Sequence, residues 1–223
     1  MTEFQKFPKI ALLFQDIVIT EQIDGINGAI GIDDDGLLAN WASGTVLGDG
    51  VVSNEGHAMY VYAQSRNRIV TPTMDDHGFA RWVWDNAASL VADLGPGLHF
   101  GEWWGSGINR GYGLPEGEKR FSLFNTERWT EPCPIQHCDS QCGLPKQFKT
   151  PGLGVVPVIW RGTFSTDAVE GTLQWLEDYG SQAAPGFMNP EGVVVYHTAG
   201  DVMFKAIIKN DKAWVRNGVS VLS

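Results

Sequence analysis

Acidic, basic and aromatic residues recur in six short segments that stand among apolar runs. In chain order they are Glu21-Gln22-Ile23-Asp24-Gly25, Ser65-Arg66, Gly101 to Gly105, Phe121 to Phe124, Glu191-Gly192 and Phe204 to Lys209. Arginine and lysine suit phosphate, carboxylates suit hydroxyl groups and hard cations, and aromatic rings offer flat stacking faces. Neither a GxxxxGK[ST] loop nor a GxGxxG turn after a strand is present, so the two commonest phosphate-binding loops are excluded.

Together these segments resemble the motifs of the covalent nucleotidyltransferases, the superfamily of RNA ligases, DNA ligases and mRNA capping enzymes. The first motif of that superfamily is KxDG, and Gln22-Ile23-Asp24-Gly25 matches it except at the lysine. Glu21 and Asn27 match the extended form found in RNA ligases. The strings HFGEWWGSGINRGYGL and KRFSLFNTERW are similar to a phage-type or bacterial subgroup of RNA ligases. Six motifs in the order of the family cover nearly the whole chain.

The resemblance implies an ATP-dependent RNA ligase. In such enzymes the motif lysine attacks the α-phosphorus of ATP and forms lysyl-AMP with loss of pyrophosphate. The AMP then passes to an RNA 5′-phosphate, and an RNA 3′-hydroxyl finally expels it. Covalent catalysis divides one difficult displacement into easier ones. The implied partners are ATP, Mg²⁺ and RNA ends, and Asp24 belongs with position 22 to the catalytic motif.

The resemblance also gives roles to residues in the middle of the chain. Arg66 matches the arginine that contacts the ribose and phosphate of the nucleotide, although a solvated arginine at a strand end is the alternative. Glu102 matches the glutamate that accepts hydrogen bonds from ribose hydroxyls. Phe121 matches the aromatic residue that stacks on adenine, although a strand phenylalanine is usually part of a core.

Three residues near the C-terminus match the last motifs. Glu191 matches the acid that helps to hold a divalent cation, although a charged residue before an apolar strand is often only a strand cap. Lys205 is our candidate for the lysine that neutralises the α-phosphate, with Lys209 as the alternative. The usual KxK spacing is not kept, because Ile207 stands in its place.

Gln22 occupies the position of the nucleophile, and its amide nitrogen cannot form a stable phosphoramidate. We therefore expect this chain to bind ATP without forming enzyme–AMP. Two explanations are open: a non-catalytic relative that binds ATP and RNA ends, or a Lys→Gln change in an active enzyme that holds unreacted ATP. The second is favoured because Asp24, Arg66, Glu102, Glu191 and Lys205 are all retained. A DNA ligase or capping enzyme is a further alternative.

Cys133, His137, Cys138 and Cys142 offer ligand types that zinc prefers, but their spacing is not that of a standard finger. A loop with reduced thiols is our preferred interpretation, since three cysteines are a poor framework for disulfides.

The helices and strands that must position these residues can be predicted from the spacing of apolar residues and from turn-forming residues. Helical spacing predicts helices over Asp76 to Leu94 and Asp167 to Tyr179. Strands are predicted at Ile17 to Thr20, Ala29 to Ile32, Met59 to Ala63, Leu98 to Trp104, Arg120 to Asn125, Val155 to Arg161, Gly192 to His197 and Met203 to Ile208, with a polar loop over Asp24 to Gly28. Many strands with few helices predict an α+β fold. The resemblance implies antiparallel sheets on either side of an ATP cleft. We expect one domain over residues 1–223, without an appended OB-fold.

Composition sets the remaining limits. The chain has 43% hydrophobic residues, which excludes a disordered protein. Its 16 Lys plus Arg and 26 Asp plus Glu give a formal charge of −10, which is unusual for a protein that binds RNA. Lys119, Arg120 and Arg128 are the nearest approach to a basic cluster. The chain begins without a signal-peptide pattern and contains no long apolar run, so we expect a soluble cytoplasmic protein.

Overall fold

A computed structural model describes residues 13–33, 51–52, 58–75, 77–131 and 144–208. The described chain is α+β, as predicted, and forms two compact units. Within the described residues, the first unit comprises residues 13–22 and 157–208, and the second comprises residues 23–33, 51–52, 58–75, 77–131 and 144–156. In the described part of the chain, no helix is long and apolar enough to cross a membrane.

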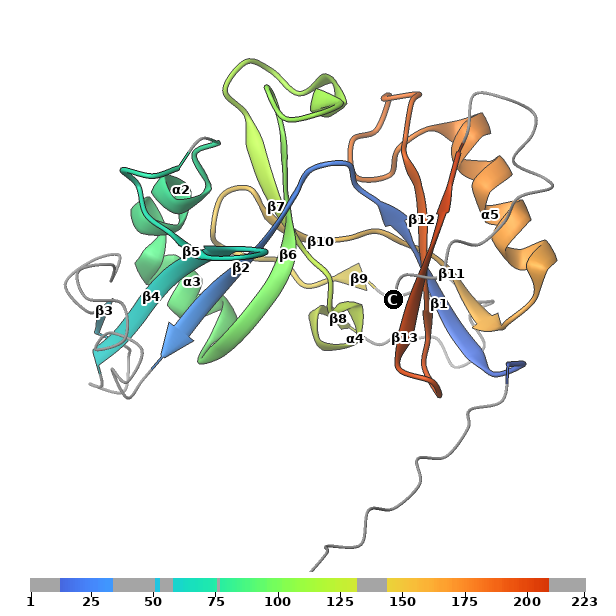
Figure 1. The fold of residues 1–223 in the computed structure, drawn as a ribbon, viewed down its shortest axis with the longest axis horizontal. Helices are drawn as coiled ribbons and strands as arrows, with labels where there is room; N and C mark the ends of the chain where they lie inside the picture. Colours follow the sequence, from blue (N-terminus) through green and yellow to red (C-terminus); the bar gives the residue numbers. More distant parts are fainter. Residues whose placement is uncertain (1–12, 34–50, 53–57, 76, 132–143, 209–223) are drawn as a thin grey trace, which may run out of the picture. The chain divides into compact units, whose positions relative to one another are not determined.

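The first unit is a four-stranded antiparallel sheet with one long helix against it (Figure 1). Its strand order is β11-β1-β12-β13, and the elements are β1 (Asp16–Gln22), β11 (Val158–Thr163), α5 (Thr166–Tyr179), β12 (Gly192–His197) and β13 (Val202–Ile207). Helix α5 begins after Ser165, whose hydroxyl accepts the Ala168 N–H at 3.0 Å, as expected of an N-cap serine. The buried side chains of α5 join those of β1 and β12 in one hydrophobic core.

The second unit is built on a larger sheet with the strand order β10-β7-β6-β2-β4-β3, and β5 pairs with β4. The strands are β2 (Ile26–Asp33), β3 (Val51–Val52), β4 (Ala58–Ser65), β5 (Ile69–Val70), β6 (Gly97–Gly105), β7 (Lys119–Leu123) and β10 (Leu153–Val155). All of these pairs are antiparallel except β10 with β7. Outside this sheet the unit contains α2 (Phe79–Asp85), α3 (Ala87–Leu94), a 3₁₀ turn η1 (Gly111–Gly113), α4 (Thr126–Trp129) and the small pair β8 (Thr130–Glu131) and β9 (Leu144–Pro145).

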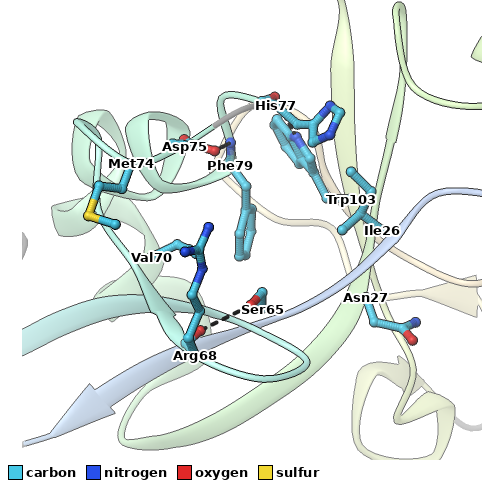
Figure 2. A pocket seen from close by; sticks show the side chains of 10 residues that line it. All are labelled: Ile26, Asn27, Ser65, Arg68, Val70, Met74, Asp75, His77, Phe79 and Trp103. Atoms are coloured by element: carbon cyan, nitrogen blue, oxygen red, sulfur yellow. Dashed lines mark hydrogen bonds between the residues drawn. The ribbon is translucent and has the colours of Figure 1, made fainter.

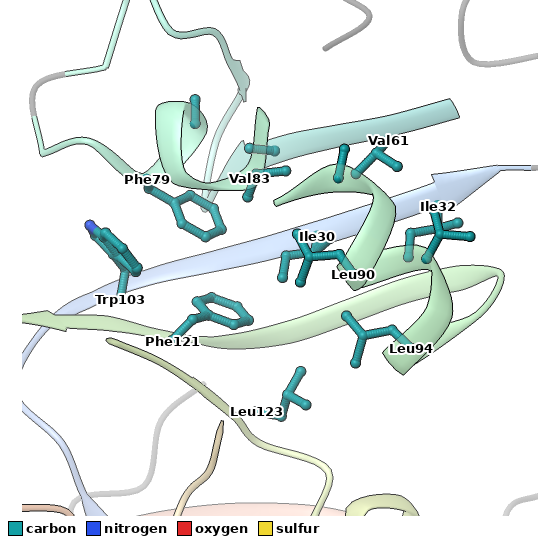
Figure 3. Close-up of a cluster of buried hydrophobic side chains, with 14 of the residues drawn as sticks. Ile30, Ile32, Val61, Phe79, Val83, Leu90, Leu94, Trp103, Phe121 and Leu123 are labelled. Carbon is teal, nitrogen blue, oxygen red and sulfur yellow. The ribbon is translucent and has the colours of Figure 1, made fainter. Parts of the chain in front are cut away.

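Helices α2 and α3 cover one face of this sheet, and the core of the second unit lies between these helices and the sheet (Figure 3). Successive residues of a strand point to opposite faces, so alternate strand residues enter the core while their neighbours face away. The residues predicted to form the apolar stripe of the helical region are all buried, namely Phe79, Val83, Ala87, Leu90 and Leu94. The opposite face of the sheet carries the side chains of Glu102 and Ser122 together with those of Phe100 and Trp104.

The prediction of one continuous helix over Asp76 to Leu94 was wrong. The structure has two helices that meet at Asn86, where the backbone leaves the helical region at φ −112° and ψ 13°. The Asn86 side chain donates to the Trp82 carbonyl at 2.8 Å, the local competition that makes asparagine a poor residue inside helices. Helix α2 begins only at Phe79, because the Asp75 carboxylate accepts the N–H groups of Phe79 and Arg81 there.

Two strand predictions also need correction. Val155 to Arg161 was predicted as one strand but is divided between β10 in one sheet and β11 in the other. Pro157 lies at the division, and proline has no N–H to continue a ladder. The predicted loop over Asp24 to Gly28 is shorter, because β2 already begins at Ile26.

A buried carboxylate, Asp93 of α3, fixes the segment that leads into β10. It accepts the N–H of Lys149 at 2.9 Å, the N–H of Thr150 at 2.8 Å and the Thr150 hydroxyl at 2.7 Å. The Lys146 ammonium donates a hydrogen bond to the Asp93 backbone carbonyl at 3.0 Å, which places a cation at the C-terminal end of α3. Asp93 is thus the main polar connection between α3 and residues 146–150.

We expect Asp93→Ala to destabilise the second unit by about 3 kcal/mol, because three donors, two of them on the buried Thr150, lose their acceptor. Urea unfolding followed by circular dichroism measures the change. Asp85→Ala, which removes an exposed carboxylate from α2, is the matched control and should change stability little. Equal effects of the two substitutions would contradict this role for Asp93.

Candidate functional site

Glu102 is the centre of a hydrogen-bond network on the face of the second unit's sheet that α2 and α3 do not cover. One carboxylate oxygen accepts the Gly25 N–H at 3.1 Å, and the other accepts the Asn27 side-chain amide at 2.6 Å. Arg66 donates to the Asn27 side-chain oxygen. Three predicted site residues, Asn27, Arg66 and Glu102, are therefore brought together by β2, β6 and the end of β4. The network joins two hydrogen-bonding groups suited to hydroxyls with one guanidinium suited to phosphate.

Gly25 is required at the entrance to this network by close packing. A Cβ atom at Gly25 would lie 2.4 Å from the Trp103 carbonyl oxygen and 2.9 Å from the Trp104 Cβ. Only glycine lets the backbone approach β6 closely enough for its N–H to reach Glu102. The glycine of the first motif is thus explained by contact with the segment that contains Glu102.

Asp24 is held by residues 109–112, a loop that contains none of the predicted site residues. Its carboxylate pairs with the Arg110 Nε at 2.9 Å and accepts from the Asn109 amide at 2.8 Å. The Asp24 N–H donates to the Tyr112 hydroxyl at 2.7 Å. Asn109 and Tyr112 both have positive φ angles, 42° and 52°, in a segment rich in glycine. Only that glycine-rich composition signalled an unusual turn in the sequence.

The structure buries Phe121 on the face opposite Glu102. Its side chain is 0% exposed and stacks on Phe79 with a centroid distance of 5.1 Å. Figure 3 shows it in the core between strand and helix residues. This is the core alternative considered for Phe121, and the ring offers no face to a ligand here.

Two other aromatic residues lie on the Glu102 side of the sheet. Phe100 and Phe124 are 54% and 37% exposed, and the Phe124 N–H donates to the Phe100 carbonyl at 3.0 Å. Phe100 stands two residues before Glu102 on β6, so alternation places both side chains on one face. Strand side chains alternate between the two faces of a sheet, and Phe121 and Phe124 are three residues apart. This odd spacing was the sequence signal that the two rings lie on opposite faces.

In the first unit, the neighbours Glu21 and Gln22 lie at the end of β1 and point to opposite faces of the sheet. Glu21 pairs with Val193, which belongs to the core beneath α5. Its buried carboxylate accepts the N–H of Gln182 at 2.7 Å and that of Ala183 at 2.9 Å. Burial raises the pKa of Glu21, while bonds from Ser181, Ala183 and Gln182 act in the opposite direction. The Glu21 side chain therefore serves the fold on the α5 face.

Gln22 shares its face of the first unit's sheet with Lys205. Gln22 pairs with Gly192, and Lys205 pairs with Val194, which in turn pairs with Thr20. Gln22 is 5% exposed, and its side-chain oxygen has no hydrogen-bond partner among the described residues. The Lys205 ammonium likewise makes no hydrogen bond or ion pair within the described part of the chain. An unpaired amide oxygen and an unpaired cation on one face favour an anionic or polar ligand.

Glu191 directly precedes β12 and accepts the Ile208 N–H with its backbone carbonyl at 2.9 Å. The next residue, Gly192, must be glycine because a Cβ atom at this position would lie 2.2 Å from the Ala206 carbonyl oxygen. Lys209, Cys133, His137, Cys138 and Cys142 lie outside the described residues. Within the described residues, no group of three or more potential metal ligands is found.

Comparison with known proteins supplies a family. A family model described as RNA ligase matches residues 15–209 of the chain. A solved structure of a Naegleria gruberi RNA ligase mutant with ATP and Mn is similar, at 15% sequence identity and a TM-score of 0.44. The similarity covers 86% of this chain and 49% of that one, so the chain spans about half the length of that protein. No curated protein sequence matches the chain.

The raised pKa of Glu21 gives a testable pH dependence. Folding favours the protonated carboxyl, so the contribution of this group to stability is complete below its ordinary pKa of 4.5 and is lost as the pH rises through the raised pKa. Relative to Glu21→Gln, we expect the unfolding free energy of the unsubstituted protein to fall as the pH rises above 4.5 and then to level off. Urea unfolding over a pH series measures it.

Glu170→Gln is the control for this series, because Glu170 is an exposed glutamate on α5. If the pH profiles of the unsubstituted protein and of Glu21→Gln run parallel, Glu21 titrates alike in the folded and unfolded states and the prediction is wrong.

Proposed function

Because the chain belongs to the RNA ligase family, we propose that it is an ATP-dependent RNA ligase adenylation domain in which Gln22 takes the place of the nucleophilic lysine. The reaction would join RNA 5′-phosphate and 3′-hydroxyl ends through lysyl-AMP and RNA-adenylate. The observation that carries the proposal is the shared sheet face of Gln22 and Lys205. A nucleophile at position 22 would have a cation on its own face to neutralise the phosphate that it attacks.

The Glu102 network supports ATP binding. Glu102 and Asn27 supply acceptor and donor groups for ribose hydroxyls, and Arg66 supplies a guanidinium for phosphate. For the adenine we propose the exposed rings of Phe100 and Phe124, because their side of the sheet is that of Glu102 and the Phe121 ring is buried. This assignment replaces the role that the resemblance gave to Phe121.

Mg²⁺ fits the residues present as a partner of ATP. It is usually held by one or two carboxylates together with substrate phosphates and water, so the lack of a larger ligand cluster among the described residues is compatible with it. Glu191 is the carboxylate proposed to hold it, and when bound the cation neutralises phosphate charge. Lys205 would add a second positive charge near the α-phosphate.

Gln22 blocks the first chemical step. Formation of enzyme–AMP requires a new bond from nitrogen to the α-phosphorus, departure of pyrophosphate and loss of a proton from the attacking amine. The lone pair of the Gln22 amide nitrogen is delocalised into its carbonyl group and does not attack. The chain is therefore proposed to bind ATP and to remain unmodified.

Gln22→Lys is expected to restore self-adenylylation. With ATP labelled at the α-phosphate and Mg²⁺, the substituted protein should become covalently labelled, while the unsubstituted protein should not. Gln22→Arg is the matched control, because it adds a positive charge without a usable nucleophile. Absence of label on a folded Gln22→Lys protein that binds ATP would refute the proposal. It would favour the alternative of a relative that binds ATP and RNA ends without chemistry.

The unsubstituted chain is expected to retain slow sealing of RNA that already carries a 5′-adenylate. In that step the RNA 3′-hydroxyl forms the new oxygen–phosphorus bond, loses its proton and expels AMP, so no lysine nucleophile is needed. Gel electrophoresis without added ATP measures the product, and RNA lacking the 3′-hydroxyl is the control. Nicked RNA duplex, nicked DNA duplex and single-stranded RNA should be compared, since preferred sealing of DNA would favour a DNA ligase.

No product above background from any adenylylated substrate over a long incubation would count against retained ligase chemistry in this chain.

A further inference from the structure

Helix α5 of the first unit presents two neighbouring aromatic rings to solvent near its C-terminal end. Trp175 is 37% exposed and Tyr179 is 64% exposed, and their ring centroids lie 5.4 Å apart. Met188 is 57% exposed and lies beside the end of the helix, because a Cβ atom at Gly180 would lie 2.8 Å from the Met188 sulfur. We call Trp175, Tyr179 and Met188 the α5 patch.

Packing within the first unit does not explain this exposure. The buried residues of α5, which form its other face, are Val169, Thr172, Leu173 and Leu176. By contrast, the rings of Phe79 and Trp103, which line a pocket in the second unit, are buried in the core of that unit (Figure 2). Large apolar side chains that gather on a surface often mark a protein interface, and Trp, Tyr and Met are enriched in interfaces.

The charge on α5 is entirely negative. The helix carries four carboxylates and no basic residue, and the acidic residues are Asp167, Glu170, Glu177 and Asp178. None of them has an ion-pair partner among the residues that the structure describes. Glu177 and Asp178 stand in the last turn, where the negative end of the helix dipole disfavours acidic side chains. This arrangement works against the stability of the helix, so it points to a role outside the helix.

We propose that the α5 patch is a docking surface for a cationic segment of a partner protein. An arginine or lysine side chain of the partner would lie on the rings of Trp175 and Tyr179 and pair with the Asp178 carboxylate. Asp178 follows Trp175 by three residues, so the two side chains are neighbours on the helix surface. A cation is attracted to the face of an indole or phenol ring, and a carboxylate beside the ring adds a charge-assisted hydrogen bond.

The same charge disfavours two other occupants. RNA carries a negative charge at every phosphate, and aromatic platforms that stack its bases stand in positively charged grooves, which α5 does not provide. A second copy of the chain that met this surface about a twofold axis would bring the carboxylates of the two α5 helices together. A positively charged protein segment avoids both conflicts, and its binding does not depend on the proposed ligase reaction.

The test measures binding of a fluorescently labelled synthetic peptide of alternating arginine and leucine to the full chain by fluorescence anisotropy. We expect this peptide to bind, and a peptide with glutamate in place of arginine not to bind. Trp175→Ala and Asp178→Lys should each raise the Kd for the cationic peptide by about tenfold or more, because each removes one part of the proposed contact.

Two substitutions on α2 of the second unit are the matched controls. Trp84→Ala removes a tryptophan that is 41% exposed, and Asp85→Lys reverses an exposed carboxylate in the last turn of that helix. Both should leave the Kd for the cationic peptide nearly unchanged. Equal weakening by Asp85→Lys and Asp178→Lys would show only a general attraction to an acidic chain, and would overturn the proposal.

Failure of the unsubstituted protein to bind the cationic peptide, or an unchanged Kd in Trp175→Ala and Asp178→Lys, would also overturn the docking surface. Self-association that Trp175→Ala abolishes in analytical ultracentrifugation would assign the patch to a second copy instead. Circular dichroism confirms that each variant is folded before binding is compared. Labelling of Gln22→Lys with ATP tests the proposed function separately, because it requires no partner protein.

Discussion

The second unit depends on one buried carboxylate that uses both of its oxygens. Glu102 joins the backbone of Gly25 to the side chain of Asn27, and so fixes the start of β2 against β6. The Asn27 side-chain oxygen also accepts a hydrogen bond from Arg66, so the same contact helps to position the Arg66 guanidinium. Gly25 can take part only because no side chain separates it from Trp103. A carboxylate so placed orders its surroundings before any ligand arrives, which lowers the entropic cost of binding.

Much of the fold could be predicted because hydrophobic period and turn residues are local signals. The strand Gly192–His197 was predicted with its observed bounds, and the buried stripe from Phe79 to Leu94 was found by its spacing. The break at Asn86 was missed because apolar spacing continues through it. A side chain that bonds to its own helix leaves no trace in such a pattern.

The sequence pointed to candidate site residues more readily than to the orientation of their side chains. Motif order picked out Glu102, Asn27 and Arg66, which the structure brings together. It could not decide whether Phe121 faces the core, since that depends on which residue of the strand pairs with Trp103. The contacts of Asp24 with Asn109 and Arg110 span about 85 residues, and no local pattern reports on bonds at that separation.

Glu21 and Gln22 show how one strand separates folding from chemistry. Adjacent residues of β1 point to opposite faces, and only Glu21 is tied to the backbone beyond α5. The anchoring of the strand therefore does not pass through the side chain at position 22. A side chain exchanged at position 22 therefore leaves the Glu21 contacts with Gln182 and Ala183 in place. Under the proposed function, a single substitution at this position would switch the first chemical step on or off.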